Sequence, residues 1–470
     1  MNSGFTWTIL LALLLVTALG LAFGAARAEV VTTPLPLELQ RSQTCAVTAN
    51  GINVDVVDTA VNHWRTWTSR PMLDTTPVAW IEMTEPITVS VTFAGVDVTE
   101  AVVRPLSLGI VPIVDGSTVT FELTLPANIT VEYNGDVKDA LHLFATAPDL
   151  DAPDPAAENL IYFGPGIHDV RTTTLQSGQT VYLAPGAVLR GQIVASDVEN
   201  ISILGHGIID GSTYDRWEDI LVPIDLTRCE NVVVKGVTIL DPAAWTLNTY
   251  LCSDVLIEDV KIIGARSNSD GITTQSCERV TVRNCFVRGW DDNLVVKGYD
   301  ADARDILFED CVLWTDLAQS MEIGYETRAD VIERVKFRNI TVLHNFHKPV
   351  MSIHNSDNAL VQDVTFENIV VEDAQMGQGD GSPTLIELTT SKSQWSKTEE
   401  RGNIRNVTFD SVTVVSGLDR SIKLLAASKE CTIDGVVFRN FNILGKHVQT
   451  VKDVKFTRTN KVGDNIVWEP

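Results

Sequence analysis

The sequence is poor in basic residues. Its 470 residues include 36 Lys and Arg against 61 Asp and Glu, which gives a formal net charge of -25 at pH 7. Nucleic acids and anionic lipids bind basic surfaces, so this balance argues against both as partners. It also disfavours a polyanionic substrate, unless a local basic site overrides the overall charge.

The sequence also lacks the Cys-x-x-Cys pairs and Cys/His clusters that form structural zinc sites. We therefore expect no metal and no cofactor. Seven cysteines are present. This is an odd number, so at least one thiol is unpaired or bonds to another chain.

Long apolar runs are absent beyond the N-terminus. Only residues 9 to 23 approach the ~18 apolar residues of a membrane span, and an Ala-rich segment follows them. This pattern predicts a signal peptide over residues 1–28, cleaved after Ala28. The protein would then be secreted or periplasmic, with no membrane contact after cleavage. No Lys or Arg precedes the run, so an uncleaved N-terminal anchor is the alternative.

Short segments with alternating apolar residues fill the next part of the chain. Examples are ITVSVTF from Ile87 and STVTFELTLPANITVEY from Ser117, and Gly, Asn, Asp and Pro turns separate them. Such segments are typical of antiparallel strands, so we predict a small N-terminal β-sandwich domain over residues 29–146. A stretch rich in Pro, Asp and Ala without any period follows, which predicts a linker over residues 147–159.

From residue 201 onward the sequence repeats. A polar residue precedes an alternating apolar triplet, one or two turn residues and a second apolar triplet, as in NVVVKGVTI and DVLIEDVKI. The units begin at Asn231, Asp254, Arg279, Asp305, Arg334, Asp363, Asn406 and Gly435. Two short strands, a corner and a third strand per unit are typical of stacked β-helix coils. An apolar period of 2 excludes helical repeats. We therefore predict an all-β chain in which a right-handed parallel β-helix over residues 160–470 forms the catalytic domain.

Aligning the units assigns residues to the interior of the helix. The first and third positions after each start are apolar and include the column Phe308, Phe337, Phe366, Phe409 and Phe438. Cys285 and Cys311 lie in an inward aliphatic column, where we interpret them as small buried hydrophobes. Cys229, Cys252 and Cys277 share another column at coil spacing, which is within reach of a disulfide. One bridge there is an open possibility.

Three acidic residues depart from this regular pattern. Asp270 ends an SNSDG turn before one third strand, and Asp291 and Asp292 precede the next third strand. An isolated Asp at a corner would have a structural role because it tolerates turn backbone. Carboxyls this close raise one another's pKa, so one can act as an acid while another acts as a base. Glycosidic cleavage needs such a set.

Motifs around these residues resemble a known group of enzymes. GHGIIDG from Gly205, NSDG from Asn268 and WDDNLVVKG from Trp290 are similar to motifs of the polygalacturonase clan of glycoside hydrolases (family 28). A later stretch resembles the family 49 dextranases and isopullulanases, through Glu322, Gly324, Tyr325, Arg328, Val342, Leu343 and His344. The resemblance implies an inverting mechanism, with Asp291 as general acid and Asp270 with Asp292 holding the attacking water.

The sequence departs from the polygalacturonase pattern at two places. Gln319 stands where those enzymes carry a Gly-His-Gly motif, and their later Arg-x-Lys is not evident, although Lys423 lies on a suitable strand. Together with the acidic charge, these departures favour a neutral polysaccharide or oligosaccharide, in the manner of a dextranase. A pectin hydrolase of the polygalacturonase type is the alternative.

We predict that several further residues bind the substrate. They are Asn268, Lys297, Gln319, Glu322, Tyr325, Arg328, His344, Trp290 and Trp314. The tryptophans could stack on pyranose faces or pack inside the protein. Lys297 could bond to sugar, tune a carboxylate or be an ordinary surface lysine, and His344 could belong to a distal subsite or face solvent.

Two other classes of function stay open. A polysaccharide lyase would use calcium with Asp270, Asp292 and Glu322, and Lys297 or Arg328 as base. A noncatalytic β-helix would bind a glycan without cleaving it. The sequence indicates no oligomeric state.

Overall fold

The computed structural model of the chain describes residues 30–63, 67–150, 152–375, 384–417 and 421–469. The predicted signal peptide lies outside these residues and stays a prediction. In the described part, no helix is long and apolar enough to cross a membrane.

The N-terminal strands form two sheets packed face to face. One sheet contains β1 (Val30–Val31), β4 (Val56–Val61), β5 (Asp74–Met83), β7 (Ala101–Arg104), β10 (Asn128–Tyr133) and β11 (Asp136–Thr146). The other contains β2 (Cys45–Ala49), β3 (Ile52–Val54), β6 (Ile87–Phe93), β8 (Ile113–Asp115) and β9 (Thr118–Leu123). The alternating residues predicted to face inward are buried between them, such as Val89, Val91 and Ile129. The predicted small sandwich is confirmed.

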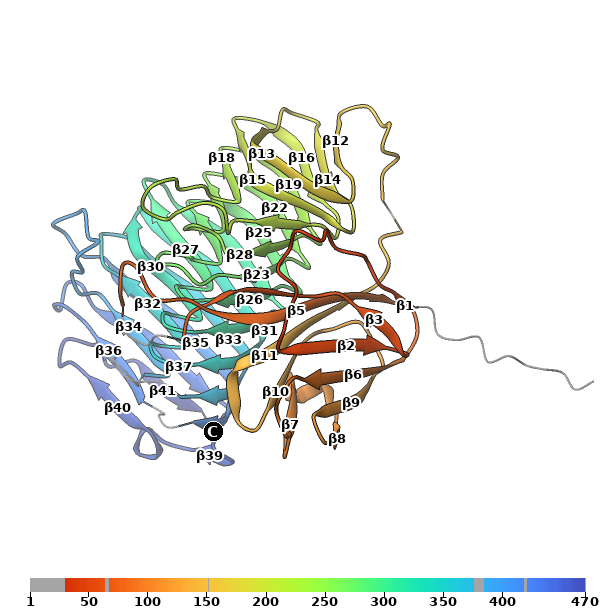
Figure 1. Cartoon of the computed structure of the whole chain (residues 1–470). Helices are drawn as coiled ribbons and strands as arrows, with labels where there is room; N and C mark the ends of the chain where they lie inside the picture. The colour runs from red at the N-terminus through yellow and green to blue at the C-terminus, as the bar shows by residue number, and fades with distance from the viewer. Residues whose placement is uncertain (1–29, 64–66, 151, 376–383, 418–420, 470) are drawn as a thin grey trace, which may run out of the picture.

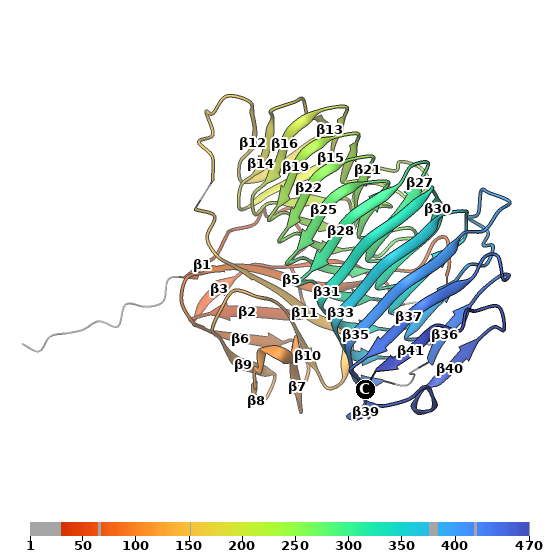
Figure 2. The same cartoon turned by 180° about the vertical axis from the view of Figure 1, so that it is seen from behind.

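The rest of the chain winds into a right-handed parallel β-helix (Figures 1 and 2). Its N-terminal end is formed by β12 (Leu160–Phe163), β13 (Gly166–Thr174), β14 (Thr180–Leu183) and β15 (Ala187–Ser196). Each later coil contributes three strands, and every strand pairs in parallel with its equivalent one coil on.

The first strands of the coils carry the repeat. They are β16 (Glu199–Leu204), β19 (Glu230–Lys235), β22 (Ser253–Glu258), β25 (Glu278–Arg283), β28 (Ala303–Glu309), β37 (Ile433–Arg439) and β41 (Ile466–Glu469). The second strands are β17 (Ile208–Asp210), β20 (Thr238–Leu240), β23 (Lys261–Ile263), β26 (Phe286–Gly289), β29 (Val312–Thr315) and β38 (Phe441–Ile443). In three coils the first and second strands are continuous, as β31 (Val331–Asn345), β33 (Leu360–Ala374) and β35 (Asn403–Gly417).

The third strands follow the loops that carry the aspartates. They are β18 (Ile224–Thr227), β21 (Leu247–Tyr250), β24 (Ile272–Gln275), β27 (Leu294–Tyr299), β30 (Met321–Arg328), β32 (Met351–Asn355), β34 (Ile386–Thr389), β36 (Ser421–Leu425) and β40 (Lys455–Arg458). A short strand β39 (Lys446–Val448) and two short 3-10 helices, η1 (Leu106–Leu108) and η2 (Val451–Asp453), complete the elements of the described residues.

The predicted inward columns are confirmed. The five phenylalanine rings stack from coil to coil, with neighbouring centroids 4.8 to 5.4 Å apart and planes within 8° of parallel. This spacing follows from the distance of about 4.8 Å between paired strands. Turn residues such as Asn284, Asp310 and Asn339 have φ near +55°, which is the left-handed backbone that corner residues of this type tolerate.

Six of the seven cysteines are buried, and Cys431 is partly exposed. All seven are free thiols, and Cys285 and Cys311 are fully buried in the aliphatic column as predicted. In the other column, the Cys252 thiol accepts a hydrogen bond from the Cys229 backbone at 3.4 Å. The open possibility of a disulfide there is not realised, and these residues act as small apolar side chains.

The sandwich packs against the second strands of the β-helix (Figures 1 and 2). Val78 and Phe144 from the sandwich share an apolar cluster with Ile208, Phe286 and Trp314 from the helix. Burying apolar side chains of this size stabilises an interface by about 1.5–3 kcal/mol per side chain. The third strands lie on another side of the helix and keep their outward face clear of this interface.

Candidate active site

The aspartates are brought together by the register of the third strands. Ile272 of β24 pairs with Leu294 of β27, so Asp270 and Asp292 occupy the same position on adjacent coils. The Gly271 amide donates to the Asp292 carbonyl at 2.8 Å, and the Asn293 amide donates to the Gln319 carbonyl at 2.9 Å. Asp270, Asp292 and Gln319 therefore form one column, which we name the aspartate column.

Asp291 lies beside this column. One of its carboxyl oxygens accepts a hydrogen bond from the Asn268 amide and the other from the Asp292 amide, both at 3.1 Å. Asn268 has φ +60°, and its side chain accepts a bond from Arg216 at 2.8 Å. The SNSDG turn thus holds the Asp291 carboxyl in place through its backbone. Asp291 is partly exposed, whereas Asp270 and Asp292 are 4% and 6% exposed.

Burial and repulsion perturb the two buried carboxyls. Burial, followed by repulsion from Asp291, raises the pKa of Asp270 to about 7. The same causes, with repulsion from Asp270 added, raise the pKa of Asp292 well above its usual range. The two groups therefore titrate as a coupled pair that holds a proton near neutral pH.

Lys297 is part of this cluster and not an ordinary surface lysine. Its ammonium lies 3.7 Å from the Asp270 carboxylate and 2.9 Å from that of Glu326. Burial would lower its pKa, but attraction to Asp270 and Glu326 outweighs burial and raises the pKa above its usual value. Its charge in turn lowers the pKa of Asp270, so Lys297 is placed to tune this carboxyl.

Gln319 and Tyr325 border the aspartates on the next coil. The Gln319 amide N–H donates to the Asp292 carboxyl at 2.9 Å, and the Gln319 side chain donates to the Tyr325 hydroxyl at 3.1 Å. The Tyr325 ring stacks on His354 with centroids 4.3 Å apart. Both residues were predicted at the site, and the structure places them there.

Glu322 lies under these rings and is fully buried. Its carboxylate contacts His354 Nδ1 at 2.8 Å, and His354 Nε2 lies 3.4 Å from Glu387. Burial would lower the pKa of His354, but attraction to Glu322 and Glu387 outweighs it and raises the pKa to about 10. Glu322 therefore supports a cationic histidine and does not reach a substrate. This corrects the prediction for Glu322.

The predicted stacking tryptophans are buried as well. Trp290 and Trp314 have no exposed surface, so neither can contact a sugar. Trp314 lies in the interface with the sandwich, where the Arg288 guanidinium covers its ring at 4.2 Å and the His344 ring lies 4.3 Å from it. The sequence could not decide whether Trp314 stacks on a sugar or packs inside the protein, because the surface that covers it belongs to the sandwich.

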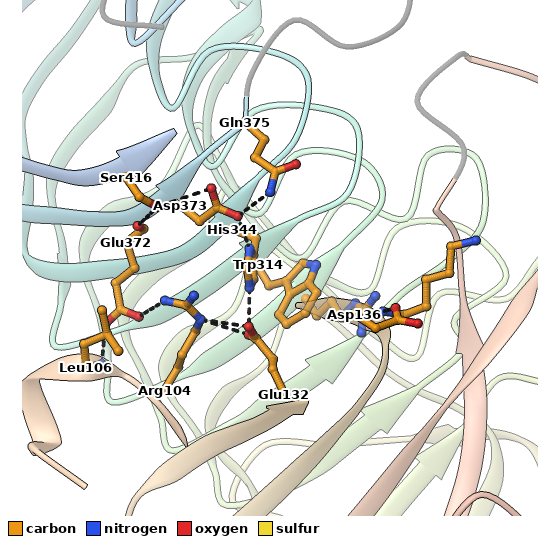
Figure 3. A network of polar contacts seen from close by, with 12 residues as sticks. Arg104, Leu106, Glu132, Asp136, Trp314, His344, Glu372, Asp373, Gln375 and Ser416 are labelled. Carbon is orange, nitrogen blue, oxygen red and sulfur yellow. Dashed lines mark hydrogen bonds and ion pairs between the residues drawn. The ribbon is translucent and has the colours of Figure 1, made fainter. Parts of the chain in front are cut away.

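His344 belongs to this interface too (Figure 3). Its Nε2 contacts Glu132 at 2.7 Å and its Nδ1 contacts Asp373 at 2.9 Å. Arg104 bonds to Glu132 at 3.0 Å and to Glu372 at 2.8 Å. We name these five residues the interface network. Neither a substrate contact nor solvent exposure holds for His344, because the sandwich covers it.

Arg328 is the last residue of β30, at the opposite end of that strand from Gln319. It pairs with Asp300 and covers the Tyr299 ring at 4.8 Å. The structure therefore does not bring Arg328 to the aspartates.

Three neighbours of the aspartates were not among the predicted site residues. Glu326 pairs with Lys297, His354 stacks on Tyr325, and Trp245 occupies the aspartate column one coil before Asp270, because Leu247 pairs with Ile272. The register of the repeats was a sufficient signal for Trp245. The other two depend on the β30 bulge, which no repeat predicts.

A cavity of about 550 Å³ lies elsewhere, between the sandwich and the β-helix. Tyr182 and other residues line it, and none of the three aspartates does. Of its acidic side chains, Glu258 and Asp259 are paired with Lys235 at 3.5 Å and Lys261 at 2.8 Å, and Asp149 accepts a hydrogen bond from the Tyr182 hydroxyl at 3.0 Å. Carboxylates that are paired in this way have a structural role. We therefore place the candidate site at the aspartate column. Within the described ranges, no group of three or more His, Cys, Asp and Glu side chains is arranged to hold a metal ion.

Comparisons with known proteins confirm the resemblance seen in the motifs. Residues 166–462 match the model of the family described as "Glycosyl hydrolases family 28". An exopolygalacturonase of Zea mays is 24% identical over 264 residues, which are 52% of this chain and 62% of that protein. A polygalacturonase of Gossypium barbadense is 20% identical over 247 residues, which are 49% of this chain and 58% of that protein. The match thus spans about three fifths of the length of these relatives.

Among solved structures, Dex49A from Penicillium minioluteum aligns with a TM-score of 0.63 and 16% identity, over 93% of this chain and 96% of that one. The alignment covers the sandwich together with the β-helix. At this identity the likeness concerns the fold alone.

Proposed function

The chain belongs to family 28 of the glycosyl hydrolases, and from this premise we propose that it hydrolyses a neutral polysaccharide or oligosaccharide with inversion at the anomeric carbon. The reaction takes place at Asp270, Asp291 and Asp292. The proposal names a more specific substrate than membership of the family implies, and it differs from the relatives named above, which are polygalacturonases.

The observation that carries the choice of a neutral glycan is the pairing of the cations near the aspartates. Lys297 lies against Asp270 and Glu326, His354 lies between Glu322 and Glu387, and Lys423 lies 3.6 Å from Glu387. These cations already face carboxylates, so a uronate carboxylate would compete with fixed negative charges for them.

Arg216 is a further cation, which contacts the turn that carries Asp270. It donates to the Ser267 carbonyl at 3.1 Å and to the Asn268 side chain at 2.8 Å, so its hydrogen bonds hold the SNSDG turn. The hydroxyls of a neutral sugar need no countercharge, and the partly exposed Asp291 and Asn268 can bond to them.

We propose that Asp291 protonates the leaving oxygen. Water adds to the anomeric carbon as the glycosidic bond breaks, and a proton of that water passes to the coupled pair of Asp270 and Asp292. One ionised carboxylate, on either Asp270 or Asp292, is sufficient to accept this proton. Two observations support the acid role of Asp291: the resemblance of the WDD motif to family 28, and the position of the Asp291 carboxyl beside the column, where the Asn268 and Asp292 amides hold it.

Polygalacturonate is the second candidate substrate, because the curated relatives are polygalacturonases. A lyase or a noncatalytic binder would use the same face of the β-helix. A lyase creates an unsaturated product with new ultraviolet absorbance, and a binder creates no new reducing ends.

The test is a screen for reducing-end release from dextran, pullulan, arabinan, pectin and polygalacturonate. We expect release from a neutral glycan by the wild-type protein and its loss in Asp291→Asn. Efficient cleavage of polygalacturonate without cleavage of any neutral glycan would refute the proposed substrate class. New absorbance in place of reducing ends would refute hydrolysis.

A further inference from the structure

Trp245 continues the aspartate column by one coil toward the N-terminus. Leu247 of β21 pairs with Ile272 of β24, and the Thr246 amide donates to the Asp270 carbonyl at 3.0 Å. The backbones of Trp245 and Asp270 are therefore one strand spacing apart, about 4.8 Å.

Trp245 differs sharply from the other members of its column in exposure. Its side chain is 42% exposed, whereas Asp270, Asp292 and Gln319 are 4%, 6% and 1% exposed. Among the residues that the structure describes, its indole makes no hydrogen bond and no ring contact. Single exposed apolar residues are common on protein surfaces, so exposure alone does not mark a site. Trp245 is distinguished by its place directly beside the aspartates, where its aromatic face can bury the apolar face of a sugar.

The strand that follows Trp245, β21, carries polar side chains and no Lys or Arg. Asn248 is the first outward residue of β21, and its amide donates to Asp225 at 2.8 Å and accepts from Gln275. These amides and carboxylates can bond to hydroxyls. An aromatic face bordered by such groups matches a pyranose ring, which has apolar faces and a polar rim.

Loops on the neighbouring coils border this strand on both sides. Trp217, on the loop between β17 and β18, donates its indole N–H to the Ser69 carbonyl of the sandwich at 2.7 Å. The Ser267 hydroxyl, on the loop that carries Asp270, donates to the Thr68 carbonyl at 2.8 Å. Thr68 and Ser69 lie in residues 67–73 ahead of β5, so the sandwich contacts the loops on this side of the helix. The loops around Trp245 are thus held in place before any ligand binds, which lowers the entropic cost of binding.

We infer that Trp245 is the stacking platform of a sugar-binding subsite next to the cleaved bond, and that this subsite takes a neutral pyranose ring. The inference rests on the proposed function for the position of the cleaved bond. It adds a residue that neither the motifs nor the aspartates identify.

The experiment measures binding separately from cleavage. In the Asp291→Asn background, the dissociation constants of isomaltotetraose and maltotetraose are measured by calorimetry. Reducing-end release from the same sugars is measured with wild-type protein. We expect Trp245→Ala to weaken binding of the bound sugar ~10-fold or more, equivalent to about 1.4 kcal/mol, and Trp245→Phe to retain most of the affinity.

Trp395→Ala is the matched control. Trp395 is 45% exposed on the loop that follows β34, five coils beyond β21 and so roughly 24 Å along the helix axis. We expect no change in affinity for this variant. Thermal melting checks that each variant is folded, and the exposure of both rings predicts small shifts.

The outcomes separate the two proposals. If Trp245→Ala weakens binding no more than Trp395→Ala, or if neither sugar binds, the inference is wrong. If a sugar binds in a Trp245-dependent manner but the wild-type protein does not cleave it, the subsite stands and the proposed hydrolysis of that sugar fails.

Discussion

Two of the buried clusters of charged side chains differ in how their charges are arranged, namely the aspartate column with its neighbours and the interface network. In the interface network, opposite charges alternate: Arg104 contacts Glu132 and Glu372, and His344 contacts Glu132 and Asp373. In the aspartate column, Asp270 and Asp292 stack on adjacent coils beside Asp291, and Lys297 approaches only Asp270 among them.

The two clusters show that the neighbours of a buried carboxyl decide what it can do. Burial by itself acts to raise the pKa of the three carboxyls of the interface network and of Asp270 and Asp292. In the interface network, attraction to His344 and Arg104 outweighs burial and lowers the pKa values of Glu132 and Asp373. Glu372 is the exception, because burial outweighs its pairing with Arg104 and raises its pKa. In the aspartate column, repulsion adds to burial and raises the pKa values of Asp270 and Asp292. Perturbation toward neutral pH suits acid and base chemistry, whereas a lowered pKa indicates structural pairing.

Breaking the interface network should have the largest effect on stability. Glu132→Ala leaves Arg104 and His344 without a shared partner in a buried site, and we expect a loss of about 3–5 kcal/mol in the free energy of unfolding. Urea denaturation measures this loss. Glu122→Ala, an exposed glutamate of the same sandwich, is the control and should change stability little. Equal effects of the two substitutions would contradict the role assigned to the interface network.

Removing the proposed acid should have the next largest effect and should act on rate. We expect Asp291→Asn to slow cleavage of a poor leaving group by ~100-fold or more, with little loss of stability because Asp291 is partly exposed. Substrates with an activated leaving group need little protonation, so they should be cleaved at partly restored rates.

Asp270→Asn and Asp292→Asn should slow both substrate types, because the water must still be activated. Proton NMR of the first-formed product should show the inverted anomer. A retained anomer, or an unchanged rate for Asp291→Asn, would contradict the mechanism.

Changing the charge next to Asp270 should shift the pH dependence of the rate. Lys297 lowers the pKa of Asp270, so Lys297→Met should raise that pKa. A base must be ionised to act, and the acidic limb of kcat/KM should therefore move to higher pH, by ~1 unit or about 1.4 kcal/mol. Lys423→Met, whose lysine pairs with Glu387, should leave the limb in place. A uniformly lower rate with an unmoved limb would show that Lys297 acts on the substrate alone.

The contrast between the clusters also explains which features could be predicted from the sequence. The β-helix, the phenylalanine column and the stacking of Asp270 on Asp292 depend on a repeat, and a repeat places residues one coil apart wherever it is read. The interface network joins Glu132 to His344 across 212 positions in sequence. No period connects them, so His344 and Trp314 could not be distinguished from exposed residues. The β30 bulge that carries Tyr325 and Glu326 interrupts the repeat, and its contacts escaped prediction for the same reason.

The smallest expected effect is on stability. An Asp→Asn substitution should raise the free energy of unfolding in the aspartate column and lower it in the interface network. The pKa of Asp270 is raised to about 7, so the native state holds a proton that the unfolded state has lost between about pH 4 and pH 7. The stabilisation due to this proton is fully present below the pKa that Asp270 has in the unfolded state. It is lost as pH rises through the pKa that Asp270 has in the folded state. Above pH 7 the native state carries a buried charge that Asp270→Asn removes.

We therefore expect Asp270→Asn to be about 1 kcal/mol more stable than wild type at pH 8, because lost pairing with Lys297 offsets part of the relief. The two proteins should converge near pH 4, where Asp270 is protonated and neutral like Asn. The pKa of Asp373 is lowered, so its stabilisation is present above its unfolded pKa and is lost as pH falls through its folded pKa. Asp373→Asn should thus destabilise at pH 8. Urea denaturation from pH 4 to pH 8 measures both effects, and a loss of stability at pH 8 in both variants would show that the aspartate column, like the interface network, is built for stability.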